Sequence, residues 1–180
     1  MSDQLALRPV EEADLALIEQ LTFDPAGMGP FLWFGWQDRR RWRRNWQDDG
    51  LVGPDGGTLI VHNGAGPLGL VNWRRQTTTP TSFCWEIGIV LAPQARGHGY
   101  GWQAQRLLVR YLFAHTTVHR IWAATESGNI AEQRALEKAG FAKEGMMRGV
   151  GWRDGAWRDG VCYSLLRTDP AADCEASAEA

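Results

Sequence analysis

The feature that most restricts the fold of this chain is a glycine-rich loop set between an apolar strand and an amphipathic helix. Alternation predicts a strand over 83–90, and residues 96–101 read Arg-Gly-His-Gly-Tyr-Gly. The helix predicted over 101–116 carries apolar residues at helical spacing: Ala104, Leu107, Leu108, Tyr111 and Leu112. A helix that begins directly after a strand presents unpaired N–H groups, and these donors together with the helix dipole form an anion site.

The glycines of this loop favour a bound phosphate group. Gly97, Gly99 and Gly101 let the backbone approach phosphate oxygens closely, and Arg96 adds a fixed positive charge. The pattern alone fits a plain glycine-rich turn equally well. A Walker loop would end in Gly-Lys-Ser/Thr, but Trp102 follows the last glycine. A dinucleotide fingerprint would need one more residue before that glycine and an acid roughly 20 residues further on.

Periodicity and turn signals predict one layered domain. The expected strands cover 5–9, 58–62, 68–75, 83–90, 120–125, 141–150 and 160–167, and the expected helices cover 11–21, 38–47, 101–116 and 129–139. Loops are expected at 22–35, 50–57 and 77–81. We therefore expect a mixed sheet with helices on both faces in a single domain over residues 1–168. Residues 169–180 form an acidic tail that we expect to be disordered.

Composition limits the environment and the partners of the chain. Its 180 residues are 44% hydrophobic, and no apolar run approaches the ~20 residues needed to cross a bilayer. No secretory signal follows Met1, and Cys84, Cys162 and Cys174 lack metal or redox spacing. We therefore expect a reduced, cytoplasmic protein without a metal. The net charge of −2 argues against a general nucleic-acid binder.

Two motifs, in the correct order, resemble the signatures of one known family. Residues 87–101 are similar to the acyl-CoA motif Gln/Arg-x-x-Gly-x-Gly/Ala of the GNAT superfamily, and residues 129–141 resemble its second signature. Residues 159–166 are similar to the closing strand of its RimJ/RimL-like branch. The resemblance implies an α/β (α+β) fold, with a mixed, mostly antiparallel central sheet that is flanked by helices and splayed next to the acyl-CoA loop.

The resemblance also implies that acetyl-CoA is the acyl donor. Its pyrophosphate would lie on the loop and the first helical turn, which comprise Arg96, Gly97, His98, Gly99, Tyr100, Gly101 and Trp102. Its pantetheine arm would bond to the strand end, which comprises Ile89, Val90 and Leu91. Asn129 and Arg134 would lie along the same cofactor, although Asn129 fits a helix N-cap equally well.

Glu86 is the candidate catalytic base. An amine attacks a thioester only when it is unprotonated, and strand alternation places Glu86 on the same face as Gly88, which leaves room for a substrate. The alternative is an ion pair between Glu86 and a neighbouring arginine. No general acid is identified, because Glu132 stands where relatives often have serine; Ser127 and Tyr163 are the residues that remain to be considered for this role. A thiol with a pKa of ~8.5 leaves without much help.

The resemblance implies that the aromatic segment over 31–46 borders the acceptor cleft. Trp33 and Trp36 lie in a Gly/Pro-broken loop and are the candidates for acceptor contact. Trp42 and Trp46 share one helix face, and we expect them to pack that helix onto the domain.

These observations predict an N-acetyltransferase that moves the acetyl group directly to a primary amine in a ternary complex. The acceptor is either a protein N-terminal α-amine or a small-molecule amine. The alternative is a non-catalytic acyl-CoA-binding or protein-interaction module, suggested by Glu132 and by the Trp/Arg-rich helix. We expect a monomer or a homodimer, with no membrane partner.

Overall fold

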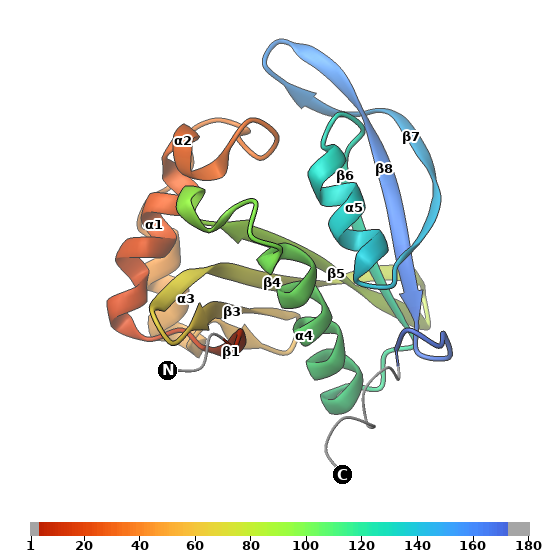
Figure 1. Ribbon diagram of the computed structural model, residues 1–180, viewed down its shortest axis with the longest axis horizontal. Helices are drawn as coiled ribbons and strands as arrows, with labels where there is room; N and C mark the ends of the chain where they lie inside the picture. The colour runs from red at the N-terminus through yellow and green to blue at the C-terminus, as the bar shows by residue number, and fades with distance from the viewer. Residues whose placement is uncertain (1–3, 173–180) are drawn as a thin grey trace.

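The computed structural model describes residues 4–172, and its centre is one sheet of eight strands (Figure 1). The strands are β1 (Ala6–Pro9), β2 (Val52–Gly53), β3 (Gly56–Asn63), β4 (Gly66–Thr79), β5 (Ser82–Leu91), β6 (Arg120–Glu126), β7 (Ala142–Arg153) and β8 (Ala156–Leu166). Their order in space is β1-β3-β4-β5-β6-β8-β7, and β2 pairs with β3. Only the β5–β6 pair is parallel. This mixed, mostly antiparallel sheet confirms the predicted fold class.

Helices cover both faces of the sheet (Figure 1). They are α1 (Leu15–Phe23), α2 (Pro25–Met28), α3 (Arg41–Asp49), α4 (Tyr100–His115) and α5 (Ile130–Lys138), with 3₁₀ turns at Glu12–Asp14 and Pro93–Ala95. In the described part of the chain, no helix combines the length and the hydropathy of a membrane span.

All three segments that we expected to be loops contain regular structure. The expected loop 50–57 contains β2 and the start of β3, which pair with each other. The short helix α2 lies inside the expected loop 22–35, because the Asp24 side chain accepts a hydrogen bond from the N–H of Ala26 and Pro25 takes the first helical position. Strand β4 continues into the expected loop 77–81, because its end still pairs with β5. Pairing with β5 therefore decides where β4 ends.

Alternate side chains of the central strands enter two separate hydrophobic cores. Leu59 and Val61 of β3 pack with residues of α4 and α5, whereas Ile60 between them packs with residues of α1. The same division occurs in β4, where Val71 joins the first core and Leu70 joins the second. Because side chains of a strand alternate between its faces, each core covers one side of the sheet. The central strands are therefore a fixed base for the site.

Strands β5 and β6 separate towards the carboxyl end of β5 (Figure 1). Their ladder contains only the pairs Trp85–Ile121 and Glu86–Trp122. Beyond these pairs, β5 continues its ladder with β4, and β6 continues its ladder with β8. The splay that the resemblance implied is therefore present, next to the glycine loop.

The expected acidic tail begins inside the described region. The Asp169 carboxylate accepts a hydrogen bond from the N–H of Leu166 at 2.9 Å, and Ala171 and Ala172 pack against the larger core. Residues 173–180, the rest of the expected tail, lie outside the described residues.

Candidate functional site

Two cavities meet where β5 and β6 separate. The first, which we call the glycine-loop cavity, has a volume of about 480 Å³ and is lined by the end of β5, residues 95–102 without His98, and α5. The second, which we call the hairpin cavity, has a volume of about 650 Å³ and is lined by β4, β5, β6, the loop after α2 and the β7–β8 hairpin. The two cavities share five lining residues: Met28, Phe31, Leu32, Ile89 and Val90.

The glycine loop leaves the start of α4 open to a ligand. Gly97 and Gly99 both have φ of 79°, in the left-handed region that glycine adopts readily. Gly99 is the N-cap of α4 and has no side chain that could accept from the first-turn N–H groups. A Cβ built on Gly97 would meet no atom within 4 Å, so the space above the loop is free. The loop therefore fits a phosphate group at a helix N-terminus.

The predicted donor contacts gather in the glycine-loop cavity, with one exception. The lining includes Ile89, Val90, Leu91, Arg96, Gly97, Gly99, Tyr100, Gly101, Trp102, Asn129 and Arg134. His98 does not line it: its side chain is exposed, and its ring lies 5.9 Å from that of Tyr100. Lys138 also lines the cavity, with its ammonium 4.6 Å above the Trp102 ring. Sequence reasoning missed Lys138, although its position at the end of the second motif could have indicated it.

The Arg96 side chain donates hydrogen bonds to backbone carbonyl groups of two separate elements, β5 and α2. Its Nε donates to the carbonyl oxygen of Leu91 at 2.9 Å, and its Nη2 donates to the carbonyl oxygen of Gly27. The guanidinium that we expected to face a phosphate therefore connects the end of β5 to helix α2. Its charge remains beside the glycine loop.

Asn129 caps α5, which is one of its two predicted roles. Its Oδ1 accepts from the N–H of Glu132 at 3.4 Å, and its Nδ2 donates to the Thr125 hydroxyl at 2.9 Å. Since Asn129 also lines the glycine-loop cavity, the cap and a ligand contact are compatible.

Glu132 is a partly buried carboxyl group on the wall of the glycine-loop cavity. Burial raises the pKa of Glu132 to about 7, and the hydrogen bond from Gln105 Nε2 at 2.6 Å only partly opposes this shift. The other polar atom of that amide, Gln105 Oε1, is buried and has no hydrogen-bond partner among residues 4–172. Glu132 therefore carries a proton at neutral pH for a substantial fraction of the time.

The two residues considered as a general acid, Ser127 and Tyr163, line neither cavity. Tyr163 is fully buried, its hydroxyl donates to Glu137 at 3.2 Å, and burial raises its pKa to about 12. The Ser127 backbone pairs with Asp159 and with the Gln133 side chain.

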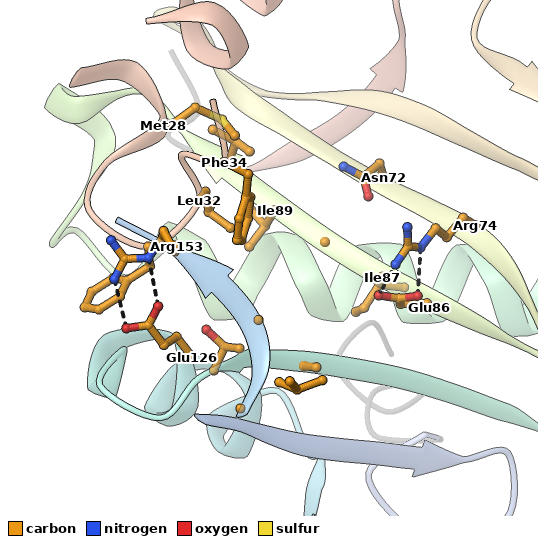
Figure 2. Close-up of a pocket in the computed structure, with 18 of the residues that line it drawn as sticks. Met28, Leu32, Phe34, Asn72, Arg74, Glu86, Ile87, Ile89, Glu126 and Arg153 are labelled. Atoms are coloured by element: carbon orange, nitrogen blue, oxygen red, sulfur yellow. Dashed lines mark hydrogen bonds and ion pairs between the residues drawn. The ribbon is translucent and has the colours of Figure 1, made fainter. Parts of the chain in front are cut away.

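Glu86 lies in the hairpin cavity and forms the ion pair that we had considered as its alternative role. Arg74 donates to both carboxylate oxygens of Glu86, at 2.7 and 2.8 Å (Figure 2). The bond to Glu86 raises the pKa of Arg74. Next to this pair, Asn72 occupies the position that a side chain on Gly88 would need, because a Cβ there would lie 3.0 Å from Asn72 Oδ1. Glu86 itself lines the hairpin cavity, so its carboxylate faces a region that a substrate can enter.

A second carboxylate–arginine pair lies in the same cavity. Arg153 donates to both oxygens of Glu126, each at 2.9 Å, and the side chains are only 10% and 16% exposed. Figure 2 shows this pair on the other side of the cavity from Arg74 and Glu86. Sequence reasoning assigned no role to either residue, because Arg153 lies in an apparent turn and Glu126 ends a strand. Their meeting depends on the path of the hairpin.

The aromatic loop lines the hairpin cavity through residues that we did not predict. Trp33 and Trp36 pack edge to face on each other at 5.1 Å, Trp36 is 80% exposed, and neither lines a cavity. Phe31, Leu32 and Phe34 of the same loop are lining residues instead. The path of the loop places Phe31, Leu32 and Phe34 along the cavity and leaves Trp33 and Trp36 outside its lining.

Trp42 and Trp46 pack α3 onto the domain, as predicted. Their indole N–H groups donate to the Thr22 hydroxyl at 2.8 Å and to the Val10 carbonyl at 3.1 Å, and both rings pack against the smaller core. Within residues 4–172, no group of three or more His, Cys, Asp or Glu side chains is arranged to hold a metal ion.

Comparison with known proteins gives a family match over most of the chain. Residues 4–142 match the family model described as an acetyltransferase (GNAT) domain. The chain is 39% identical over 83 residues to the Bacillus subtilis protein named "Probable N-acetyltransferase YjcK", an alignment that covers 46% of each protein. The chain thus spans about half the length of the first curated relatives that it matches.

Solved structures share the fold over nearly the whole chain. A spermidine N-acetyltransferase from Vibrio cholerae, in complex with CoA and spermine, has a TM-score of 0.80 at 20% identity and covers 93% of this chain and 98% of its own. RimL, the ribosomal L7/L12 alpha-N-protein acetyltransferase in complex with CoA, has a TM-score of 0.77 at 17% identity and covers 92% and 95%.

Proposed function

The chain belongs to the GNAT acetyltransferase family, and we propose that it transfers an acetyl group from acetyl-CoA directly to a primary amine while both substrates are bound. The observation that carries this proposal is the wall shared by the two cavities. A donor in the glycine-loop cavity and an acceptor in the hairpin cavity would meet beside Ile89 and Val90. Direct transfer therefore needs no covalent enzyme intermediate.

The donor substrate would bind through its pyrophosphate at the start of α4. The N–H groups of that helix turn lack a capping side chain, and the left-handed Gly97 and Gly99 allow close approach. The edge of β5 that β6 leaves uncovered offers backbone groups to the pantetheine arm. Arg134 and Lys138 add positive charge to the same wall, which suits the nucleotide phosphates.

Glu86 would remove the proton from the attacking amine, directly or through a water molecule. The amine nitrogen forms a bond to the thioester carbonyl carbon, the carbon–sulfur bond breaks, and the amine proton passes to the Glu86 carboxylate. The ion pair holds this carboxylate in one orientation. Because the Arg74 side chain is 70% exposed, the pair can open at small cost.

The departing CoA needs little assistance from an acid. The thioester oxygen gains negative charge during attack, and a backbone N–H near Val90 would stabilise it. A thiol with a pKa of ~8.5 leaves readily as the thiolate. The lack of an identified general acid is therefore compatible with turnover.

The acceptor is either a protein N-terminal α-amine or a small-molecule amine. The names of the two structural relatives support one possibility each, ribosomal L7/L12 and spermidine. A cavity of about 650 Å³ accommodates a small molecule or the first residues of a peptide.

A thiol-release assay against a panel of amines tests the proposal. We expect CoA release that depends on the amine, an acetylated amine by mass spectrometry, and intersecting initial-rate plots. Parallel plots would contradict the ternary complex. Tight acetyl-CoA binding without release on any amine would favour the second candidate, a non-catalytic acyl-CoA-binding module, for which Glu132 in the usual serine position is the supporting observation.

A further inference from the structure

We infer that the acceptor amine also carries an anionic group, such as a carboxylate, attached to an apolar body. The inference rests on the proposed function and names its substrate class. It comes from the charged side chains that line the hairpin cavity, which are Arg41, Arg74, Arg153, Arg158, Glu86, Glu126 and Asp159.

Most of the negative charge in this cavity is already neutralised. Glu86 and Glu126 each receive two hydrogen bonds from one guanidinium. The third acid, Asp159, lies at the exposed rim, and its Oδ1 accepts from the N–H of Gly149 at 2.7 Å. Besides Glu86, which receives the reacting amine, a polyamine would therefore find one partly satisfied carboxylate at Asp159. It would reach Glu126 only by displacing Arg153, whose side chain is 10% exposed.

Two arginines of the cavity are not neutralised in this way. Arg158 on β8 and Arg41 on α3 form no ion pair within residues 4–172. The Arg158 Nε is buried without a hydrogen-bond partner there, and the Arg41 guanidinium only lies over the Trp42 ring at 5.2 Å. A buried N–H without an acceptor is unfavourable, and rotation of the Arg158 guanidinium onto a ligand oxygen would remove that cost.

The geometry of these groups suits an anionic oxygen pair more than a second cation. A guanidinium presents its donors in a planar fork that matches carboxylate or phosphate oxygens. Apolar side chains line the space between the charged groups: Phe31, Leu32, Phe34, Ile87, Trp122 and Val150. An acceptor with an amine at one end, an apolar middle and an anionic group therefore complements the cavity.

Matched pairs of acceptors test this inference. We would compare L-phenylalanine with L-phenylalaninamide, and the peptide amide Ser-Glu-Phe with Ser-Gln-Phe, because each pair differs only in one negative charge. The readout is kcat/KM at saturating acetyl-CoA, corrected for the fraction of unprotonated amine, with spermidine as the polycationic reference. We expect the anionic member of at least one pair to be favoured about tenfold, as for a charge-assisted bidentate contact, and spermidine to be poorer.

Substitutions of Arg158 and Arg41 test whether these two residues cause the preference for anionic acceptors. Arg158→Gln and Arg41→Gln should each reduce the preference several-fold, whereas Arg148→Gln should preserve it, because Arg148 is an exposed arginine of β7 that lines neither cavity. Arg41 is exposed on α3, so its substitution does not threaten the fold. Equal rates within both pairs, a preference for spermidine, or an unchanged ratio in both variants would overturn the inference and leave the proposed function intact.

Binding separates this inference from the proposed function. If acetyl-CoA binds but no amine is acetylated, the proposed function is wrong. Calorimetric titration of the same pairs into the CoA-loaded protein then decides the inference by itself. Tighter binding of the anionic members would support an anion-binding cavity, and equal binding would overturn it.

Discussion

The two cavities are built in different ways. The glycine-loop cavity is formed largely by backbone conformation and by two continuous segments, 89–102 and 129–138, in which neighbours in sequence are neighbours in space. The hairpin cavity is formed by side chains from α1, α3, β4, β5, β6, β7, β8 and the loop after α2. The first depends on main-chain geometry, in particular on the left-handed conformations of Gly97 and Gly99. The second depends on which side chains the tertiary structure brings together.

The carboxyl groups of the two cavities differ in how their charge is balanced. In the hairpin cavity, Glu86 and Glu126 are each held by an arginine, so their charges are compensated where they lie. In the glycine-loop cavity, Glu132 has only the neutral amide of Gln105, and its burial favours the protonated form. In the hairpin cavity, an arginine therefore balances the charge of Glu86 and of Glu126. In the glycine-loop cavity, burial disfavours a negative charge on Glu132, next to the expected phosphates of acetyl-CoA.

The largest expected effect distinguishes the two arginine-paired carboxylates of the hairpin cavity, Glu86 and Glu126. Glu86→Gln should lower kcat at neutral pH by on the order of 100-fold, because a positioned general base contributes about that much or more. The acetyl-CoA dissociation constant, measured by calorimetry, should not change. Glu126→Gln is the matched control, since Glu126 has the same bidentate pairing across the same cavity. Unchanged turnover in Glu86→Gln, or a larger loss in Glu126→Gln, would remove Glu86 from the role of base.

A glycine substitution tests whether CoA binding depends on the backbone conformation of the glycine loop. Gly97→Ala should weaken CoA binding about tenfold, because a left-handed conformation costs a Cβ-bearing residue ~1–2 kcal/mol and the loop would relax away from it. Gly50→Ala is the control: Gly50 also has a left-handed φ of 65° and open space, but it ends α3 and lines neither cavity. It should lower stability without changing the CoA dissociation constant. Equal CoA affinity in both variants would contradict a binding role for the loop.

The protonation of Glu132 gives a pH-dependent prediction of stability. In the folded protein its pKa is raised to about 7, whereas the unfolded chain loses this proton near the ordinary value of 4.5. Between these values the folded state holds more protons, so the contribution of Glu132 to the unfolding free energy falls as pH rises and levels off above about 7.

Glu132→Gln should therefore stabilise the ligand-free protein at pH 8.5 relative to pH 5.5. The expected difference is on the order of 1–2 kcal/mol, after allowance for partial solvent exposure. Urea denaturation of both proteins at the two pH values measures it. A gain that is the same at both pH values would mean that Glu132 titrates normally.

The smallest expected effect concerns the aromatic loop. Phe34→Ala should raise the KM of the acceptor by a factor of roughly three, because the ring lines the hairpin cavity but is 61% exposed. Trp36→Ala should leave the KM within experimental error, since Trp36 lines neither cavity. A larger effect at Trp36 would restore the role that its residue type suggested.

The difference between the cavities also explains what could be predicted from the sequence. The glycine loop follows from local pattern, and the resemblance to the GNAT signatures implied the splay and eleven of the residues that line the glycine-loop cavity. His98 was the exception, because motif membership does not say which side of a loop a side chain faces. In the hairpin cavity, Glu86 was the only predicted site residue besides the shared Ile89 and Val90. Its pairing with Arg74 depends on the cross-strand register of β4 and β5.

The remaining part of the hairpin cavity was beyond sequence reasoning for the same reason. Trp33 and Trp36 were chosen as aromatic residues in a Gly/Pro-broken loop, but the path of the loop presents Phe31, Leu32 and Phe34 to the cavity instead. Glu126 and Arg153 come from strands that are separated by β8 in the sheet, so no spacing in the sequence connects them. A residue pair of this kind can be found only after the strand order is known.

The attachment of Arg96 to Gly27 has a consequence for how such a protein can diversify. The guanidinium holds the region before the aromatic loop through a carbonyl oxygen, a group that every amino acid supplies. Substitutions in residues 31–37 can therefore alter the selectivity of the hairpin cavity without releasing its wall from the glycine loop. New acceptors could arise by changes in that segment, while the machinery for the common donor is inherited intact.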